Sequence, residues 1–180
     1  TIKIMKTLLT LFVLFSFTVV ADDIKDFQIE GMSIGDSLLD FFSLDEINNS
    51  KVYNNYKSNK MQKVTFKKSY FFKTYEIVEV NYRSNDNYYI IEQINGILLY
   101  KENQLSECIK LVHKISSDDL FRNTKYEFSE DTRSHPQDPS GESIQYTKFL
   151  GLDNGYVIYQ CIDWTKQMNF IDHLKVGLVS

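Results

Sequence analysis

Residues 144–163 read IQYTKFLGLDNGYVIYQCID, and this stretch predicts two β-strands joined by a tight turn. Apolar and aromatic side chains recur over residues 144–152 and 156–163, as is typical of strands. Asp153-Asn154-Gly155 stands between these runs, and Asn-Gly favours a hairpin turn because that turn needs positive φ angles. The stretch therefore predicts an antiparallel hairpin, with Cys161 on its second strand.

Further strand patterns lie on both sides of this hairpin. Short runs of β-branched and aromatic residues predict strands at 62–68, 73–83 and 88–94, and a final strand at 174–179. Asn95-Gly96 predicts a second tight hairpin, with its returning strand at 98–101. Hairpin-linked strands with few helices between them indicate an antiparallel sheet and not a parallel, doubly wound one.

Helix signals are few and stand apart from the strands. Residues 37–42 predict a short helix after a turn, capped by Ser33 or Asp36. Ser43 and Glu46 have capping-box spacing, which predicts a second short helix at 44–49. The longest helix, which Asn103 can cap, has an apolar stripe of Leu105, Cys108, Ile109, Val112 and Ile115.

These elements define the fold class as α+β. We expect about five to seven antiparallel strands, short N-terminal helices, and one longer helix packed on one face of the sheet. Both prolines of the chain fall in a polar stretch at residues 122–143, which we expect to be a long loop.

The first 21 residues have the pattern of a cleavable secretory signal peptide. Met5-Lys6 is basic, residues 7–19 are apolar, and small or β-branched residues precede the expected cleavage after Ala21. Residues 1–4 then lie upstream of the true start at Met5. The apolar run is shorter than the roughly 20 residues of a spanning helix, so we expect cleavage and no stable membrane span. An uncleaved signal anchor is the alternative.

The remaining residues, 22–180, suit one α+β domain in the periplasm or outside the cell. Cys108 and Cys161 are the only cysteines, and disulfides persist in such compartments, so we predict one bridge from the long helix to the sheet. Two separate buried thiols are the alternative. The net charge of -4 at pH 7 gives no electrostatic case for binding nucleic acid.

No catalytic, metal or cofactor motif fits its context. Residues 31–35, Gly-Met-Ser-Ile-Gly, match the nucleophile elbow G-x-S-x-G, but they precede any strand that could carry an elbow, so a turn is the better interpretation. The histidines lack metal-ligand spacing. His135 with Glu130, Asp131 and Asp138 could hold a cation, although acidic loops are more often simply solvated. We expect no cofactor and no metal.

Two regions are candidates for a binding surface. Loops as long as residues 122–143 are usually either functional or disordered. Aromatic side chains crowd the first half of the sheet, where they contact a partner if exposed and form core if covered. The candidate surface comprises Tyr70, Phe72, Tyr75, Tyr82, Tyr88, His135 and Asp138.

Three segments, residues 27–39, residues 94–97 with Glu107-Cys108, and residues 161–164, resemble small exported proteins of unknown function from AT-rich marine bacteria. That resemblance implies no activity. Gly31-Met32-Ser33 before a short helix is similar to the opening of SmpA/OmlA-type outer-membrane-assembly lipoproteins and of β-lactamase-inhibitor-like modules. Those modules pair small helices with an antiparallel sheet and bind proteins, but the lipid-bearing Cys of the lipoproteins is missing here.

The function expected from these observations is that of a non-enzymatic periplasmic binding module. Its sheet face or long loop would contact another protein or a cell-envelope component. The alternative is a small periplasmic hydrolase or lyase that uses carboxylates such as Glu76 or Glu79 beside tyrosines. An enzyme of that kind requires a pocket in which a carboxylate converges with a Tyr or His.

Overall fold

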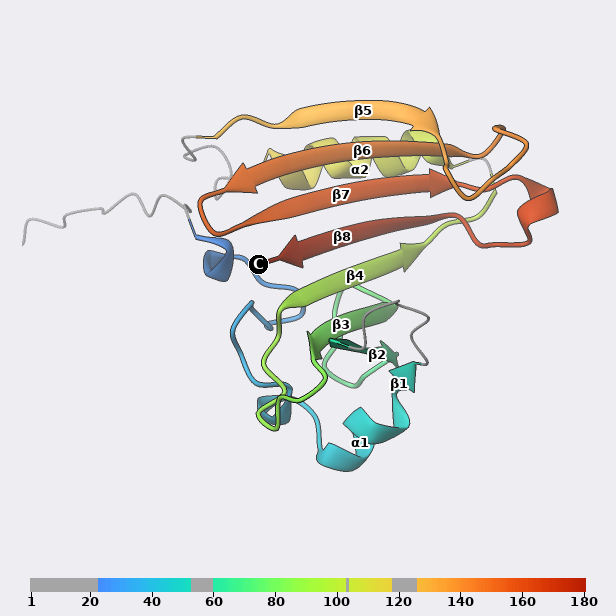
Figure 1. Ribbon diagram of the computed structural model, residues 1–180. Helices are drawn as coiled ribbons and strands as arrows, with labels where there is room; N and C mark the ends of the chain where they lie inside the picture. Colours follow the sequence, from blue (N-terminus) through green and yellow to red (C-terminus); the bar gives the residue numbers. More distant parts are fainter. Residues whose placement is uncertain (1–22, 53–59, 103, 118–125) are drawn as a thin grey trace, which may run out of the picture.

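Strands dominate the computed structural model, where they form a single open antiparallel sheet (Figure 1). The structure describes residues 23–52, 60–102, 104–117 and 126–180, so the expected signal peptide and Asn103 lie outside the described residues. The described sheet has 8 strands in the order β1-β2-β3-β4-β8-β7-β6-β5, more than expected. They are β1 (Lys51–Val52), β2 (Met61–Lys67), β3 (Ile77–Arg83), β4 (Gln93–Leu99), β5 (Ser129–Ser134), β6 (Ile144–Leu152), β7 (Gly155–Asp163) and β8 (His173–Val179).

The hairpin predicted from residues 144–163 is confirmed. β6 and β7 pair along their whole length, and the register closes at Leu152 opposite Gly155, which leaves Asp153-Asn154 as the turn. The Asn154 side chain also accepts a hydrogen bond from the Ile24 N–H (3.1 Å). The turn therefore holds the start of the described chain against the sheet.

Strand pairing gives the sheet two chemically different faces. Directly paired residues of antiparallel strands point to the same side, so the register defines each face across the sheet. One side, which we call the packed face, is apolar and buried. A single row of paired residues crosses it, each 2% exposed or less: Val64, Val80, Ile94, Leu178, Val157 and Leu150.

Short helices and the N-terminal segment cover the packed face, and their side chains join the same core. Ser43 and Glu46 form the predicted capping box at the start of α1, with the Ser43 N–H donating to Glu46 Oε2 (2.8 Å). The preceding short helix is capped by Ser37, not by Ser33 or Asp36. The described helices are η1 (Ile24–Asp26), η2 (Leu38–Asp40), α1 (Leu44–Asn49), α2 (Leu105–Ser116) and η3 (Lys166–Met168).

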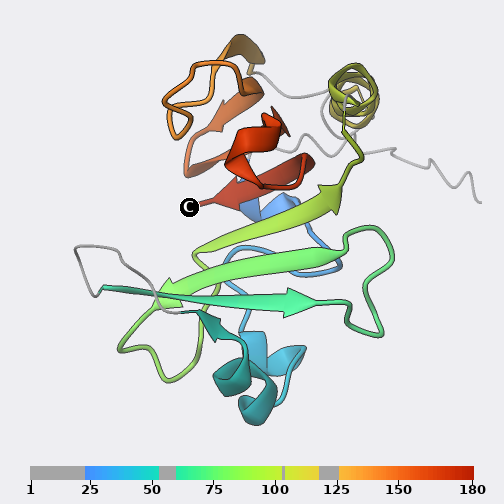
Figure 2. The same ribbon diagram turned by 90° about the vertical axis from the view of Figure 1, so that its right-hand side faces the viewer.

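The longest described helix, α2, packs beside β7 on the packed face, behind the sheet in Figure 1 and to its right in Figure 2. Its apolar stripe faces the core as predicted, with Cys108 and Val112 buried. The predicted bridge between Cys108 and Cys161 is also confirmed, with the two Cα atoms 5.9 Å apart. Helix and sheet are thus joined covalently.

The predicted hairpin at Asn95-Gly96 is wrong, because β4 runs straight through both residues. Asn95 pairs with Gly177 and Gly96 with Val176 on the neighbouring strand β8. Gly96 is needed for close packing: a Cβ there would lie 2.6 Å from the Tyr75 ring. Of the strand expected at 88–94, residues 93 and 94 belong to β4, and residues 88–92 form the connection that leads into it.

The loop expected at residues 122–143 is shorter than predicted. Residues 122–125 lie outside the described residues, and residues 129–134 form the edge strand β5, paired with β6. All six residues of β5 are exposed, so its sequence, SEDTRS, has no alternating apolar pattern. Pairing with β6, and not its own hydrophobicity, makes this segment a strand.

Candidate functional site

The side of the sheet opposite the packed face, which we call the open face, is polar. In Figure 1 no described helix lies in front of β5–β8, whereas α2 lies behind them. The strand pairing places five cationic and two carboxylate side chains on the open face, although the whole chain carries a net charge of -4 at pH 7. They are Lys63, Lys67, Arg83, Arg133 and Lys175, with Glu79 and Asp131.

Lys175 lies near the middle of the open face, between Ile97 on β4 and Gln160 on β7. It is half-buried, and among the described residues its ammonium makes neither a hydrogen bond nor an ion pair. Glu79 pairs instead with Lys63. Burial lowers the pKa of Lys175, and Glu79 partly opposes that shift.

At one end of the sheet the β5–β6 loop (residues 135–143) meets the β7–β8 loop (residues 164–172), at the right of Figure 1. The Trp164 ring contacts His135, with ring centroids 4.2 Å apart, and Phe170, with centroids 4.9 Å apart. The Trp164 N–H of the main chain donates to Asp172 (2.7 Å). The indole is therefore braced by two loops.

Asp138 ties the two loops together. Its Oδ2 accepts hydrogen bonds from the Ser143 N–H (2.9 Å), the Ser143 hydroxyl (2.6 Å) and the Thr165 hydroxyl (3.3 Å). Its Oδ1 accepts from the N–H and hydroxyl of Ser140 (2.9 and 2.7 Å). These donors hold the pKa of Asp138 well below its usual range. Asp138 thus has a structural task, since its oxygens are already occupied.

The two histidines at this end of the sheet favour the neutral form. His135 Nδ1 accepts a hydrogen bond from the Gln137 N–H (3.2 Å), so its proton lies on Nε2. His173 Nδ1 lies 2.8 Å from the Ile171 carbonyl oxygen and donates to it, which leaves Nε2 as an acceptor. Burial lowers the pKa of both imidazoles.

Three clefts surround Trp164. A cleft of about 420 Å³ is lined by Gln137, Trp164, Asn169, Phe170, Ile171 and His173. Two others, of about 350 and 490 Å³, lie on the side of Glu102 and Lys166. Ligand sites typically have volumes in this range. Trp164, Phe170 and Ile171 were not among the sequence candidates for a binding surface, although apolar residues in a strand-connecting loop could have marked them. His173, at the start of β8, was not among those candidates either.

The aromatic candidates do not form one surface. Tyr70 and Tyr88 are 92% and 74% exposed, Phe72 and Tyr75 are half-buried, and Tyr82 is 2% exposed in the core. All five lie on β3 or in the connections on either side of it, whereas His135 and Asp138 lie in the β5–β6 loop. The candidates therefore divide into an aromatic group and a loop group.

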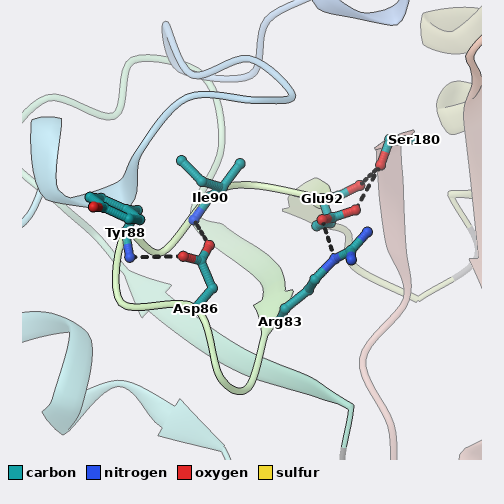
Figure 3. Close-up of polar contacts among 6 residues, drawn as sticks. All are labelled: Arg83, Asp86, Tyr88, Ile90, Glu92 and Ser180. Carbon is teal, nitrogen blue, oxygen red and sulfur yellow. Dashed lines mark hydrogen bonds and ion pairs between the residues drawn. The ribbon is translucent and has the colours of Figure 1, made fainter.

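Hydrogen bonds and an ion pair hold the loop that carries Tyr88 (Figure 3). Asp86 accepts hydrogen bonds from the Tyr88 N–H (2.8 Å) and the Ile90 N–H (2.7 Å). At its base Arg83 Nε lies 2.7 Å from Glu92 Oε1. The exposed phenol of Tyr88 is thus presented from a fixed backbone.

The expected turn at residues 31–35 is present. Ser33 is buried and its N–H donates to Asp36 (2.7 Å), while Gly31 and Gly35 have positive φ angles of 82° and 93°. The segment closes a bridge between Ile29 and Met32 and carries no sheet-mounted nucleophile. In the described part of the chain, no group of three or more His, Cys, Asp or Glu side chains could hold a metal ion.

Both carboxylates considered for catalysis already have a hydrogen-bond or ion-pair partner. Glu76 accepts from the Leu99 N–H (2.8 Å), and Glu79 pairs with Lys63. A different pair, Asp163 and Asp172, borders the clefts: burial raises the pKa of Asp163, and the neighbouring Asp172 raises it further.

Comparisons with known proteins identify no relative. No protein-family model, no curated protein and no solved structure matches the chain. None of the helices within the described ranges is long and apolar enough to cross a membrane.

Proposed function

We propose that this chain is an exported, non-enzymatic binding module that takes an acidic protein partner on the open face of its sheet. The observation that carries the proposal is half-buried Lys175, whose ammonium has no hydrogen bond or ion pair among the described residues and whose pKa is lowered by burial. A charge that is partly removed from water is costly unless it is paired. A carboxylate of the partner would supply the missing pair.

The charge around Lys175 supports an acidic partner. The five cations of the open face outnumber its two carboxylates, in a chain whose net charge has the opposite sign. Such segregation steers an acidic surface toward this side of the molecule and repels a basic one. Neighbouring Gln160, which is half-buried, would add a neutral hydrogen-bonding group at the same surface.

Export belongs to the same proposal. The signal pattern of residues 1–21 and the Cys108–Cys161 bridge support a periplasmic or secreted protein. We expect the native protein to begin at Asp22, which N-terminal sequencing of material from the producing cells would test. A chain that begins at Met5, with both thiols reduced, would contradict export.

The partner site can be tested by photo-crosslinking in the producing cells. Benzoylphenylalanine in place of Gln160 should yield an adduct, whereas the same probe in place of Lys110, on the exposed side of α2, should not. Lys175→Glu should abolish the Gln160 adduct, and Lys110→Glu should leave it intact. Lys175→Gln serves as a milder variant if the reversal impairs folding. Adducts of equal yield at both positions, or an adduct indifferent to both Lys175 changes, would refute the proposal.

A second candidate, a small hydrolase or lyase, draws on the Asp163 and Asp172 pair. A carboxyl group whose pKa is raised by burial and by a neighbouring carboxylate, beside a cleft, is a recurring arrangement in acid–base catalysis. Turnover of any substrate that Asp163→Asn abolishes, with folding intact, would establish this alternative. An equal rate in the variant would dismiss it.

A further inference from the structure

We propose that the cleft of about 420 Å³ beside Trp164 binds the ring of a neutral sugar. This site lies in the loops at the end of the sheet and does not depend on the acidic partner proposed for the open face. The inference rests on the kind of side chains that line the cleft and on how they are held.

The cleft has an exposed aromatic and aliphatic floor. Phe170 and Ile171 are 56% and 59% exposed, although they flank a braced tryptophan. Apolar side chains left in water at a concave site are typical of ligand sites and not of packing. Aromatic rings of this kind offer flat faces to the C–H face of a pyranose.

The polar side chains that line the cleft are uncharged and can both donate and accept hydrogen bonds. Gln137 and Asn169 each carry an amide that can donate and accept, which is what a ring of hydroxyl groups needs. His173 adds an acceptor at Nε2, because its Nδ1 is committed to the Ile171 carbonyl oxygen (2.8 Å). No Lys, Arg, Asp or Glu lines this cleft among the described residues, so it lacks the charge that an ionic ligand requires.

The site is preorganised. The main-chain N–H of Trp164 is fixed by Asp172 (2.7 Å), and the indole contacts the buried His135 ring. Asp138 in turn joins the loops that carry His135 and Trp164 through Thr165 (3.3 Å). A ring platform held in this way loses little conformational entropy on binding.

The test uses the fact that Trp164 is the single tryptophan of the chain, so its fluorescence reports directly on the cleft. The mature protein would be titrated with maltotriose, cellotriose and triacetylchitotriose, and separately with N-acetylphenylalanine amide as an aromatic peptide probe. We expect a saturable emission change with at least one saccharide. Phe170→Ala and Gln137→Ala should each weaken it about tenfold, as for loss of one stacking or hydrogen-bonding partner.

Gln167→Ala is the matched control for Gln137→Ala, since Gln167 is an exposed glutamine that does not line this cleft and lies in the loop that carries Phe170. It should bind as the unchanged protein does. Saturation with the phenylalanine amide alone would assign the cleft to an aromatic peptide side chain and overturn the proposal. No saturable change with any saccharide, or equal binding by Phe170→Ala, would overturn it as well.

Discussion

Removing the bridge between Cys108 and Cys161 should lower the free energy of unfolding by about 4 kcal/mol. The bridge closes a loop with a sequence separation of 53 residues. For a loop of that size, the lost chain entropy of the unfolded state is about 14 cal/mol/K, which is about 4 kcal/mol at room temperature. That is a large share of the stability of a typical domain of this size.

The cleanest comparison keeps both sulfur atoms in place. Cys108 and Cys161 are 3% and 0% exposed, so replacing them also disturbs the core, whereas reducing the bridge leaves every side chain present. Urea unfolding of the oxidised and reduced protein would measure the difference, with Cys108→Ala/Cys161→Ala as the genetic counterpart. A difference below about 1 kcal/mol would refute the entropic argument.

Three other perturbations follow from single contacts. Gly96→Ala should cost about 1–3 kcal/mol of unfolding free energy in a thermal or urea melt, because its Cβ would lie 2.6 Å from the Tyr75 ring; an unchanged midpoint would contradict this packing. Glu30→Gln should cost about 2 kcal/mol, because the carboxylate accepts three main-chain N–H bonds of 2.7 Å; a loss no larger than that of an exposed Glu→Gln change would argue against the contact. Asp163→Asn should raise stability at neutral pH. Burial and Asp172 raise the pKa of Asp163 above its ordinary value of 3.8, so the native state loses stability as the pH rises above 3.8 and this carboxyl ionises. The variant has no carboxyl group there and should lack that loss. Melts of both proteins from acid to neutral pH would check it, and parallel curves would refute it.

Local signals in the sequence predicted the elements that short-range chemistry determines. The Ser43 and Glu46 capping box and the 144–163 hairpin need only neighbouring residues to form, and both are present. Asn95-Gly96 carries the same hairpin signal as Asn154-Gly155 but lies within a strand. Pairing of β4 with β8 on one side and β3 on the other outweighs the turn preference there, and such pairing is not visible in a local pattern.

The candidate site could be predicted less well than the fold, because it depends on which strands become neighbours. Alternation along β8 indicates that Lys175 and Leu174 face opposite sides, but not which side the helices leave uncovered. α2 packs against β7 on the packed face, where the bridge to Cys161 joins it to the sheet, and no described helix covers the face of Lys175. The bridge should therefore affect the proposed binding at the open face as well as the stability of the domain. If reduction releases α2, the apolar packed face becomes exposed and should compete with the open face for the proposed partner. Loss of the selective Gln160 adduct on reduction, with Lys175 unchanged, would be the sign of that competition.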